Sequence, residues 1–143
     1  NHRMYVLSYP TCPACKKSIP RLERISETYG NEMAMYAVPY GTNPGNKEEW
    51  HRYVKKYEPA YEPLVDITSD QVSVMEANLA AMGVSQLLSG CGRGEYCVCE
   101  TPCGDEPQGF GAPTTLVTDA DGNPLAAFSG VPSVSELKEL LHH

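Results

Sequence analysis

Two cysteines with two residues between them, Cys12 and Cys15, carry the side chains in this sequence that are best suited to chemistry. They follow an apolar, strand-like run and open a segment, residues 14–29, whose apolar spacing predicts a helix. Unpaired N–H groups at a helix N-terminus stabilise a thiolate, and a thiol pKa there falls from about 8.5 to roughly 3.5–7.5. The spacing therefore predicts thiol–disulfide exchange, with an exposed Cys12 as nucleophile and a buried Cys15 as resolving thiol. An inert disulfide or one half of a zinc site is the alternative for this pair.

The composition limits the kinds of protein that this chain can be. Its 143 residues, 41% of them hydrophobic, suit one domain with one core. No apolar run approaches the roughly 20 residues of a membrane span. The net charge of −7 argues against nucleic acid or an anionic membrane as a partner. We therefore expect a single domain over residues 1–143, a monomer that does not insert into a membrane.

The start of the chain has the pattern of a strand, a helix and a second strand, over residues 3–9, 14–29 and 33–38. Pro20 falls inside the helix and should kink it, because proline removes a backbone hydrogen bond. A strand–helix–strand unit of this length forms a right-handed crossover between two parallel strands. This part of the chain therefore predicts the beginning of an α/β sheet.

The remaining elements follow the same kind of signal. Two further helices are expected, at residues 47–57 and 69–88. A strand over 113–118, a turn and a returning strand over 125–129 predict a β-hairpin, and a closing helix follows over 133–141.

Four more cysteines lie within a segment that has too many Gly and Pro residues for a helix or strand. One interpretation gives two structural disulfides, which pair Cys91 with Cys97 and Cys99 with Cys103, or Cys91 with Cys99 and Cys97 with Cys103. The other is a Cys₄ zinc or iron–sulfur site. The spacing lacks the paired CxxC motifs of structural zinc sites, so it favours disulfides over zinc. A third interpretation makes Cys97 and Cys99 a second exchange-active pair that passes electrons to the first.

The order of elements resembles the thioredoxin fold, and three local matches support the resemblance. The CxxC motif lies where a strand ends and a helix begins, and Pro20 comes five residues after Cys15. The run Gly111-Ala112-Pro113-Thr114-Thr115 directly precedes a hairpin strand and resembles that family's cis-proline loop. The resemblance implies an α/β, thioredoxin-like fold, a central mixed sheet flanked by helices. A helical and cysteine-rich insertion, residues 41–110, precedes the loop.

Within this superfamily the chain looks most like the catalytic domain of bacterial periplasmic Dsb-type disulfide isomerases. Tyr5-Val6 through Thr11-Cys12, Cys15-Lys16 and Val38-Pro39 carry this likeness, together with the insertion. Two features depart from related patterns: Thr11 stands where ordinary thioredoxins have Trp, and the isomerases' N-terminal dimerisation region is absent. The resemblance implies a periplasmic or otherwise extracytoplasmic location.

The resemblance also implies the parts of an active site. Cys12 and Cys15 would be catalytic, and Thr11, Ala112 and a cis Pro113 would bind substrate, with the Ala112 backbone pairing with an extended polypeptide. The expected activity is that of a protein thiol-disulfide oxidoreductase, whose direction as oxidase, reductase or isomerase depends on its redox potential and partners. Its partners would be proteins with thiols or disulfides and a redox partner protein. No organic cofactor is expected, because the two thiols carry the electrons.

Two alternatives from other classes remain at this point. One is a non-enzymatic metal-binding or metal-delivery module centred on the Cys91–Cys103 cluster, and the other is a redox-inactive interaction domain. Trp50, Tyr53 and Tyr57 share one face of a predicted helix. Packing against the sheet is favoured for them over a substrate-contact surface. Lys16 and Lys17 are most simply the solvent-facing side of the first helix.

Overall fold

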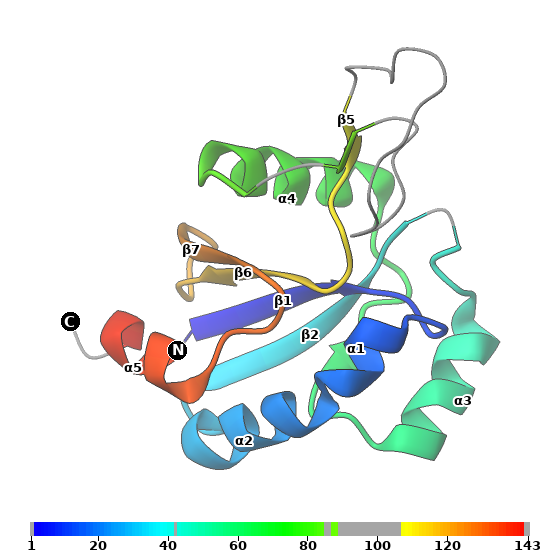
Figure 1. Ribbon diagram of the computed structural model, residues 1–143, viewed down its shortest axis with the longest axis horizontal. Coiled ribbons are helices and arrows are strands. Elements are labelled where there is room, and N and C mark those ends of the chain that lie inside the picture. Colours follow the sequence, from blue (N-terminus) through cyan, green and yellow to red (C-terminus); the bar gives the residue numbers. More distant parts are fainter. Residues whose placement is uncertain (1, 42, 85–86, 89–106, 142–143) are drawn as a thin grey trace.

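The structure is a computed structural model that describes residues 2–41, 43–84, 87–88 and 107–141. Five strands form a mixed sheet in the order β3-β2-β1-β6-β7 (Figure 1). The two central parallel strands are β1 (His2–Ser8) and β2 (Met33–Pro39), paired from His2 opposite Met33 to Ser8 opposite Pro39. This confirms the predicted strand–helix–strand unit and places the CxxC motif directly after β1.

The segment between these strands contains two helices, α1 (Pro13–Lys17) and α2 (Ile19–Tyr29), where one kinked helix was expected. Pro20 has no N–H group, so the Lys16 carbonyl lacks its usual partner four residues later. Ser18 ends the first helix and begins the second. Its N–H donates to the Cys15 carbonyl at 3.1 Å, and its own carbonyl accepts from the Leu22 N–H at 3.0 Å. The predicted kink is therefore a full interruption, which leaves α1 only five residues long.

Helix α3 (Lys47–Tyr57) has the bounds that the sequence predicts. Asn46 caps its first turn by accepting the Glu49 N–H at 2.8 Å, and the Glu49 carboxylate accepts the Asn46 N–H in return. The helix ends at Glu58, whose backbone is left-handed. The chain then forms the short edge strand β3 (Glu62–Pro63), which runs parallel to β2.

Helix α4 (Ser69–Ala81) is shorter than the expected helix over residues 69–88. Gly83 has a φ of +88°, a conformation that glycine adopts easily and that ends a helix. Beyond it, Leu87–Leu88 forms a strand, β4, antiparallel to β5 (Pro107–Gly109). The predictions of helix at 87–88 and of loop at 107–109 are therefore wrong.

The last third of the described chain contains the predicted hairpin and closing helix. Strand β6 (Thr114–Thr118) runs antiparallel to β1 and pairs with β7 (Pro124–Ser129). Asp119 organises the turn between them, since its carboxylate accepts N–H groups from Asp121 and Asn123 at 2.9 Å. The closing helix is α5 (Val134–Leu141), with Ser133 and Glu136 forming its capping pair.

Each face of the sheet has its own apolar core, as the alternation of side chains along a strand requires. Met4 and Val6 of β1 join the core that α2, α3 and α5 cover, with Leu22, Trp50 and Leu137 fully buried. Leu7 points to the opposite face, where the core beneath α4 includes Val38, Leu79, Phe110 and Leu116. Figure 1 shows α4 alone above the sheet and the other helices below or beside it.

Candidate active site

Cys12 and Cys15 form a disulfide at the end of β1, with their Cα atoms 5.2 Å apart. Cys12 is the N-cap of α1, so its backbone is extended while that of Cys15 is already helical. The carbonyl of Cys12 accepts the Lys16 N–H at 3.1 Å, the first hydrogen bond of the helix. The strand-to-helix junction thus holds both sulfurs at the place that the sequence predicts.

Both sulfurs are covered in this disulfide form. Only 1% of Cys12 and 2% of Cys15 is exposed to solvent. The prediction of an exposed Cys12 is therefore wrong for this structure, whereas the prediction of a buried Cys15 is confirmed. The carbonyl oxygen of Ala112 lies 3.7 Å from the Cys12 sulfur and contributes to this cover.

Backbone N–H groups near Cys12 provide the electrostatic environment that the sequence suggests. The Cys15 N–H donates to the Cys12 sulfur at 3.1 Å. Pro13 follows Cys12 and has no N–H, so it contributes no donor at the helix start. Because α1 is only five residues long, its dipole is small, and the Cys15 N–H is the donor that the structure places on the Cys12 sulfur.

The Ala112–Pro113 peptide bond is cis, which confirms that prediction. The loop is held on both sides by backbone and hydroxyl groups. The Thr114 hydroxyl donates to the Gly111 carbonyl, and the Pro113 carbonyl accepts the Gly130 N–H at 2.9 Å. Residue 112 therefore has a fixed position opposite Cys12, although 100 residues separate them in the sequence.

Tyr40 connects the approach to this loop with α4, and sequence reasoning missed it. Its hydroxyl donates to the Glu76 carboxylate and accepts the Phe110 N–H at 3.1 Å. Burial, followed by the hydrogen bond to Glu76, raises the pKa of Tyr40 to about 12. The tyrosine thus stays protonated at neutral pH and positions the segment that leads into the cis-proline loop. Nothing in the local sequence around Tyr40 signals this role.

A chain of buried hydroxyl groups lies beneath the end of β1. Tyr61 bonds both Ser8 and Tyr53, with oxygen–oxygen distances of 3.1 Å in each case. Burial raises the pKa of Tyr61 and of Tyr53, so both stay protonated and can donate within the chain. These bonds fix the last residue of β1 before the CxxC loop.

The loop before α3 supports the residues that precede Cys12. The Trp50 indole N–H donates to the Pro44 carbonyl at 2.8 Å. Gly45 has a φ of +84°, and a Cβ atom there would lie 2.7 Å from the ring of Pro10. Glycine is therefore needed both for the backbone conformation and for the close approach to Pro10. Burial of Trp50 and Tyr53 in this region confirms the interpretation that they pack as core residues.

The structure thus brings together most of the predicted site residues. Cys12, Cys15 and Ala112 are in close proximity, Pro113 is half-buried beside them, and Thr11 is exposed on the rim. The four cysteines of the predicted cluster, Cys91, Cys97, Cys99 and Cys103, lie outside the described residues. Within the described part of the chain, no group of three or more His, Cys, Asp or Glu side chains is arranged to hold a metal ion. None of the described helices has the length and apolar character needed to cross a membrane.

Comparisons with known proteins match the fold but not the sequence. No family model and no curated protein matches the chain. The thio-disulfide isomerase of Thermus thermophilus is 21% identical, over 98% of this chain and 76% of its own, with a TM-score of 0.58. The thioredoxin domain of a thiol-disulfide oxidoreductase from Bacteroides vulgatus is 14% identical, over 100% and 80%, with a TM-score of 0.60. MTB dsbF is 17% identical, over 99% and 79%, with a TM-score of 0.56.

This chain has the mixed sheet, the CxxC motif after β1 and the cis-proline loop before β6 that the resemblance implies. The matches confirm the resemblance to thioredoxin-like proteins, with a Dsb-type protein among the similar structures. The chain has a thioredoxin-like fold.

Proposed function

We propose that this protein is a thiol-disulfide oxidoreductase that exchanges disulfides with protein substrates through Cys12 and Cys15. One observation carries the proposal: the Cys12–Cys15 disulfide caps a helix, and the carbonyl of a cis-proline loop lies 3.7 Å from the Cys12 sulfur. A purely structural disulfide needs neither an N–H donor at its first sulfur nor a peptide segment that faces this sulfur. The fold shared with solved thiol-disulfide oxidoreductases supports the same activity.

The reaction uses only the two cysteines and the substrate. In the reduced protein the Cys12 thiolate attacks one sulfur of a substrate disulfide, a Cys12–substrate bond forms, and the other substrate sulfur leaves as a thiolate. The Cys15 thiolate then attacks the Cys12 sulfur and releases the second substrate thiolate. The substrate gains two electrons and the protein becomes the disulfide. The reverse sequence oxidises a substrate dithiol, so no organic cofactor is required.

The described contacts assign a part to each group near the sulfurs. The Cys15 N–H, 3.1 Å from the Cys12 sulfur, stabilises the thiolate before attack and when Cys12 leaves. An extended substrate segment binds beside Ala112 and pairs with its backbone, as an added β-strand does. Thr11, exposed beside Cys12, lies on the rim of this substrate site.

We place the activity outside the cytoplasm, in the periplasm or an equivalent compartment. Six cysteines in 143 residues are normal where disulfides persist and unusual where thiols are kept reduced. A secreted Mycobacterium tuberculosis disulfide oxidoreductase is among the similar structures, which supports the same location. The direction of electron flow follows from the redox potential of the pair and from the redox partner that resets it.

A pair of single-cysteine variants tests the proposal. Cys12→Ser should no longer accelerate the reduction of insulin by dithiothreitol, because the attacking thiol is gone and the buried Cys15 cannot replace it. Cys15→Ser removes the same disulfide but keeps the nucleophile, so it should accumulate mixed disulfides with substrate. These should be visible on a non-reducing gel and should disappear when the sample is first treated with dithiothreitol. A Cys12→Ser protein with wild-type activity, or a Cys15→Ser protein that traps nothing, contradicts the assignment.

A further inference from the structure

A small groove lies between α1 and α3, next to the CxxC motif. Its volume is about 230 Å³. Pro10, which precedes the motif, and Lys16, which follows Cys15, form the side of the groove nearest the cysteines. The rest of its lining comes from one face of α3: Glu49, Arg52, Tyr53, Lys56 and Tyr57. We call it the α1–α3 groove.

The charge of this groove is positive. Lys16, Arg52 and Lys56 contribute three cations, and Glu49 contributes the one carboxylate. That carboxylate is held at the start of α3, where it accepts the Asn46 N–H. Over residues 2–41, 43–84, 87–88 and 107–141, the three cations form no ion pair. Among these residues, therefore, no carboxylate neutralises their charge.

Two of the cations converge on one aromatic ring. The ammonium groups of Lys16 and Lys56 lie 5.5 and 5.3 Å from the centre of the Tyr57 ring. Desolvation is the largest single influence on the pKa of Tyr57 and acts to raise it, but the charges and hydrogen bonds of the two ammonium groups together outweigh it, and the pKa is lowered. Two like charges held on one ring repel each other, and an anion bound between them relieves that repulsion.

The sign of this charge is opposite to that of the whole chain. A net charge of −7 repels acidic polypeptides, so the chain as a whole would favour basic substrates. The groove reverses the preference at the site, because Lys16 lies about one helical turn, roughly 6 Å of rise, beyond Cys12. At physiological salt, interactions between exposed charges are largely screened beyond about 8 Å. The cation of Lys16 therefore acts on a substrate at Cys12 more strongly than the distant negative charges of the chain do.

We propose that the α1–α3 groove selects substrates by binding an acidic segment next to the cysteine that Cys12 attacks. This inference rests on the proposed oxidoreductase function and names the substrate class of the same site. Lys16, Arg52 and Lys56 pair with carboxylates of the substrate, and Tyr57 gives its chain an aromatic surface. These residues determine specificity and take no part in the exchange itself.

The test compares three peptides of equal length in which one cysteine is joined to thionitrobenzoate and is flanked by Glu, Ser or Lys. In a Cys15→Ser protein, the Cys12 thiolate attacks the peptide sulfur, a Cys12–peptide disulfide forms, and coloured thionitrobenzoate leaves. The Glu peptide should react about tenfold faster than the Lys peptide at about 0.01 M ionic strength, and the ratio should approach one at about 1 M.

Charge-reversal variants in the same Cys15→Ser background identify the groove as the cause. Arg52→Glu combined with Lys56→Glu should invert the order of the Glu and Lys peptides. Arg24→Glu combined with Lys138→Glu changes the net charge equally at exposed positions of α2 and α5, and should keep the wild-type order. Both residues of the first pair are exposed, so the fold should tolerate their replacement, which circular dichroism checks.

The outcomes separate this inference from the proposed function. If no peptide releases thionitrobenzoate faster than it reacts with a free thiol, the oxidoreductase function itself is wrong. If all three react quickly but the Glu peptide is no faster than the Ser peptide, only the groove's role is refuted. A shift in the control variant as large as that in the groove variant would also refute it, because overall charge would then explain the preference.

Discussion

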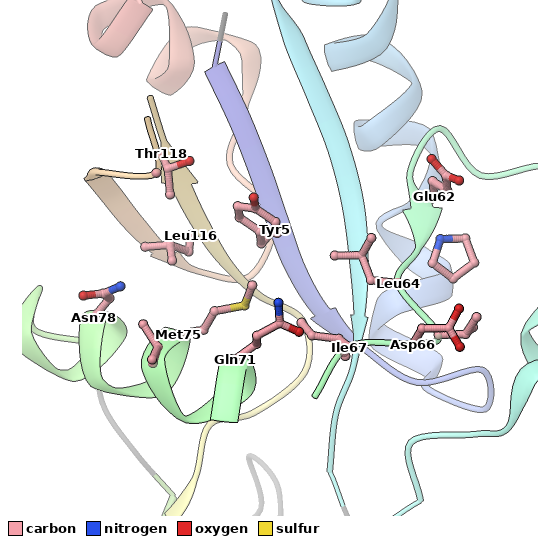
Figure 2. A pocket seen from close by; sticks show the side chains of 14 residues that line it. Tyr5, Glu62, Leu64, Asp66, Ile67, Gln71, Met75, Asn78, Leu116 and Thr118 are labelled. Carbon is pink, nitrogen blue, oxygen red and sulfur yellow. The ribbon is translucent and has the colours of Figure 1, made fainter. Parts of the chain in front are cut away.

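The two faces of the sheet differ in how completely they are filled. On the face that α2, α3 and α5 cover, Leu22, Ile25 and Trp50 have no solvent exposure. On the α4 face, a cavity of about 700 Å³ lies between the sheet and the helix (Figure 2). Side chains from β1, β6 and α4, among them Tyr5, Leu116 and Met75, surround it.

This difference shows which face positions the reactive cysteines. The filled face contains Tyr53 and Tyr61, which fix the end of β1, and Trp50, which anchors the loop that packs on Pro10. None of the residues that line the larger cavity belongs to the candidate active site. Close packing transmits a displacement to its neighbours, whereas a cavity absorbs it. Substitutions on the filled face should therefore change the reactivity of Cys12, and those at residues that line the cavity should not.

The largest expected difference comes from adding volume to each face. Ile25→Phe on the filled face should lower the free energy of unfolding by about 1–3 kcal/mol, because no space is available for the ring. Met75→Phe beside the cavity should cost less than about 1 kcal/mol. Urea unfolding measures both. Equal losses would mean that the two faces are equally tight.

A smaller difference is expected from two glycines with similar backbone angles. Gly45 and Gly122 have φ values of +84° and +89°, so alanine is strained at both, by roughly 1–2 kcal/mol. Of the two, only Gly45 would place the new Cβ against other atoms, those of the Pro10 ring and the Trp50 indole nitrogen. Only there should the rate of disulfide exchange fall as well. Stopped-flow exchange measured alongside unfolding tests this. A slowed Gly122→Ala protein would contradict the link between Pro10 and the site.

The smallest effect is expected from Tyr40→Phe, which removes one hydroxyl between the α4 face and the cis-proline loop. The Phe110 N–H and the Glu76 carboxylate lose their partner, at a cost of about 1 kcal/mol. Because Phe110 leads into the loop opposite Cys12, the reduction rate of the Cys12–Cys15 disulfide by dithiothreitol should rise. An unchanged rate would show that the loop is held without Tyr40.

The same variant changes the alkaline stability. The pKa of Tyr40 is raised from 10.0 to about 12 in the folded protein, so its stabilisation is complete below pH 10 and is lost as the pH rises through 12. Tyr40→Phe should therefore lose less stability than the wild type between these two pH values. Tyr53 and Tyr61, whose pKa values are also raised, remain in both proteins and cancel in the comparison.

Local signals explain what could be predicted from the sequence. Helix α3 was predictable to the residue because Asn46 and Glu49 cap its start and Pro59 follows its end. The end of α4 was missed because apolar residues continue to Leu88, whereas the left-handed backbone at Gly83 ends the helix. The break at Ser18 follows from Pro20, although its extent depends on how α2 packs.

The site residues were predictable in kind but not in their contacts. The CxxC motif indicates its chemistry together with its place between a predicted strand and a predicted helix, and the cis form of Pro113 came from the resemblance to thioredoxin-like proteins. The burial of Cys12 could not be foreseen, because the Ala112 carbonyl that approaches it belongs to a distant part of the chain. The bonds of Tyr40 and of Tyr61 likewise join distant segments, and no local pattern records them.

The separation of Cys12 from Ala112 has a consequence for biosynthesis. Cys12 leaves the ribosome 100 residues before Ala112, and Gly130, whose N–H holds Pro113, follows later still. A nascent chain therefore presents both thiols without this cover until that later segment has been made. During that interval the pair can react with any thiol or oxidant it meets, and access becomes restricted once the cis-proline loop has folded onto Cys12.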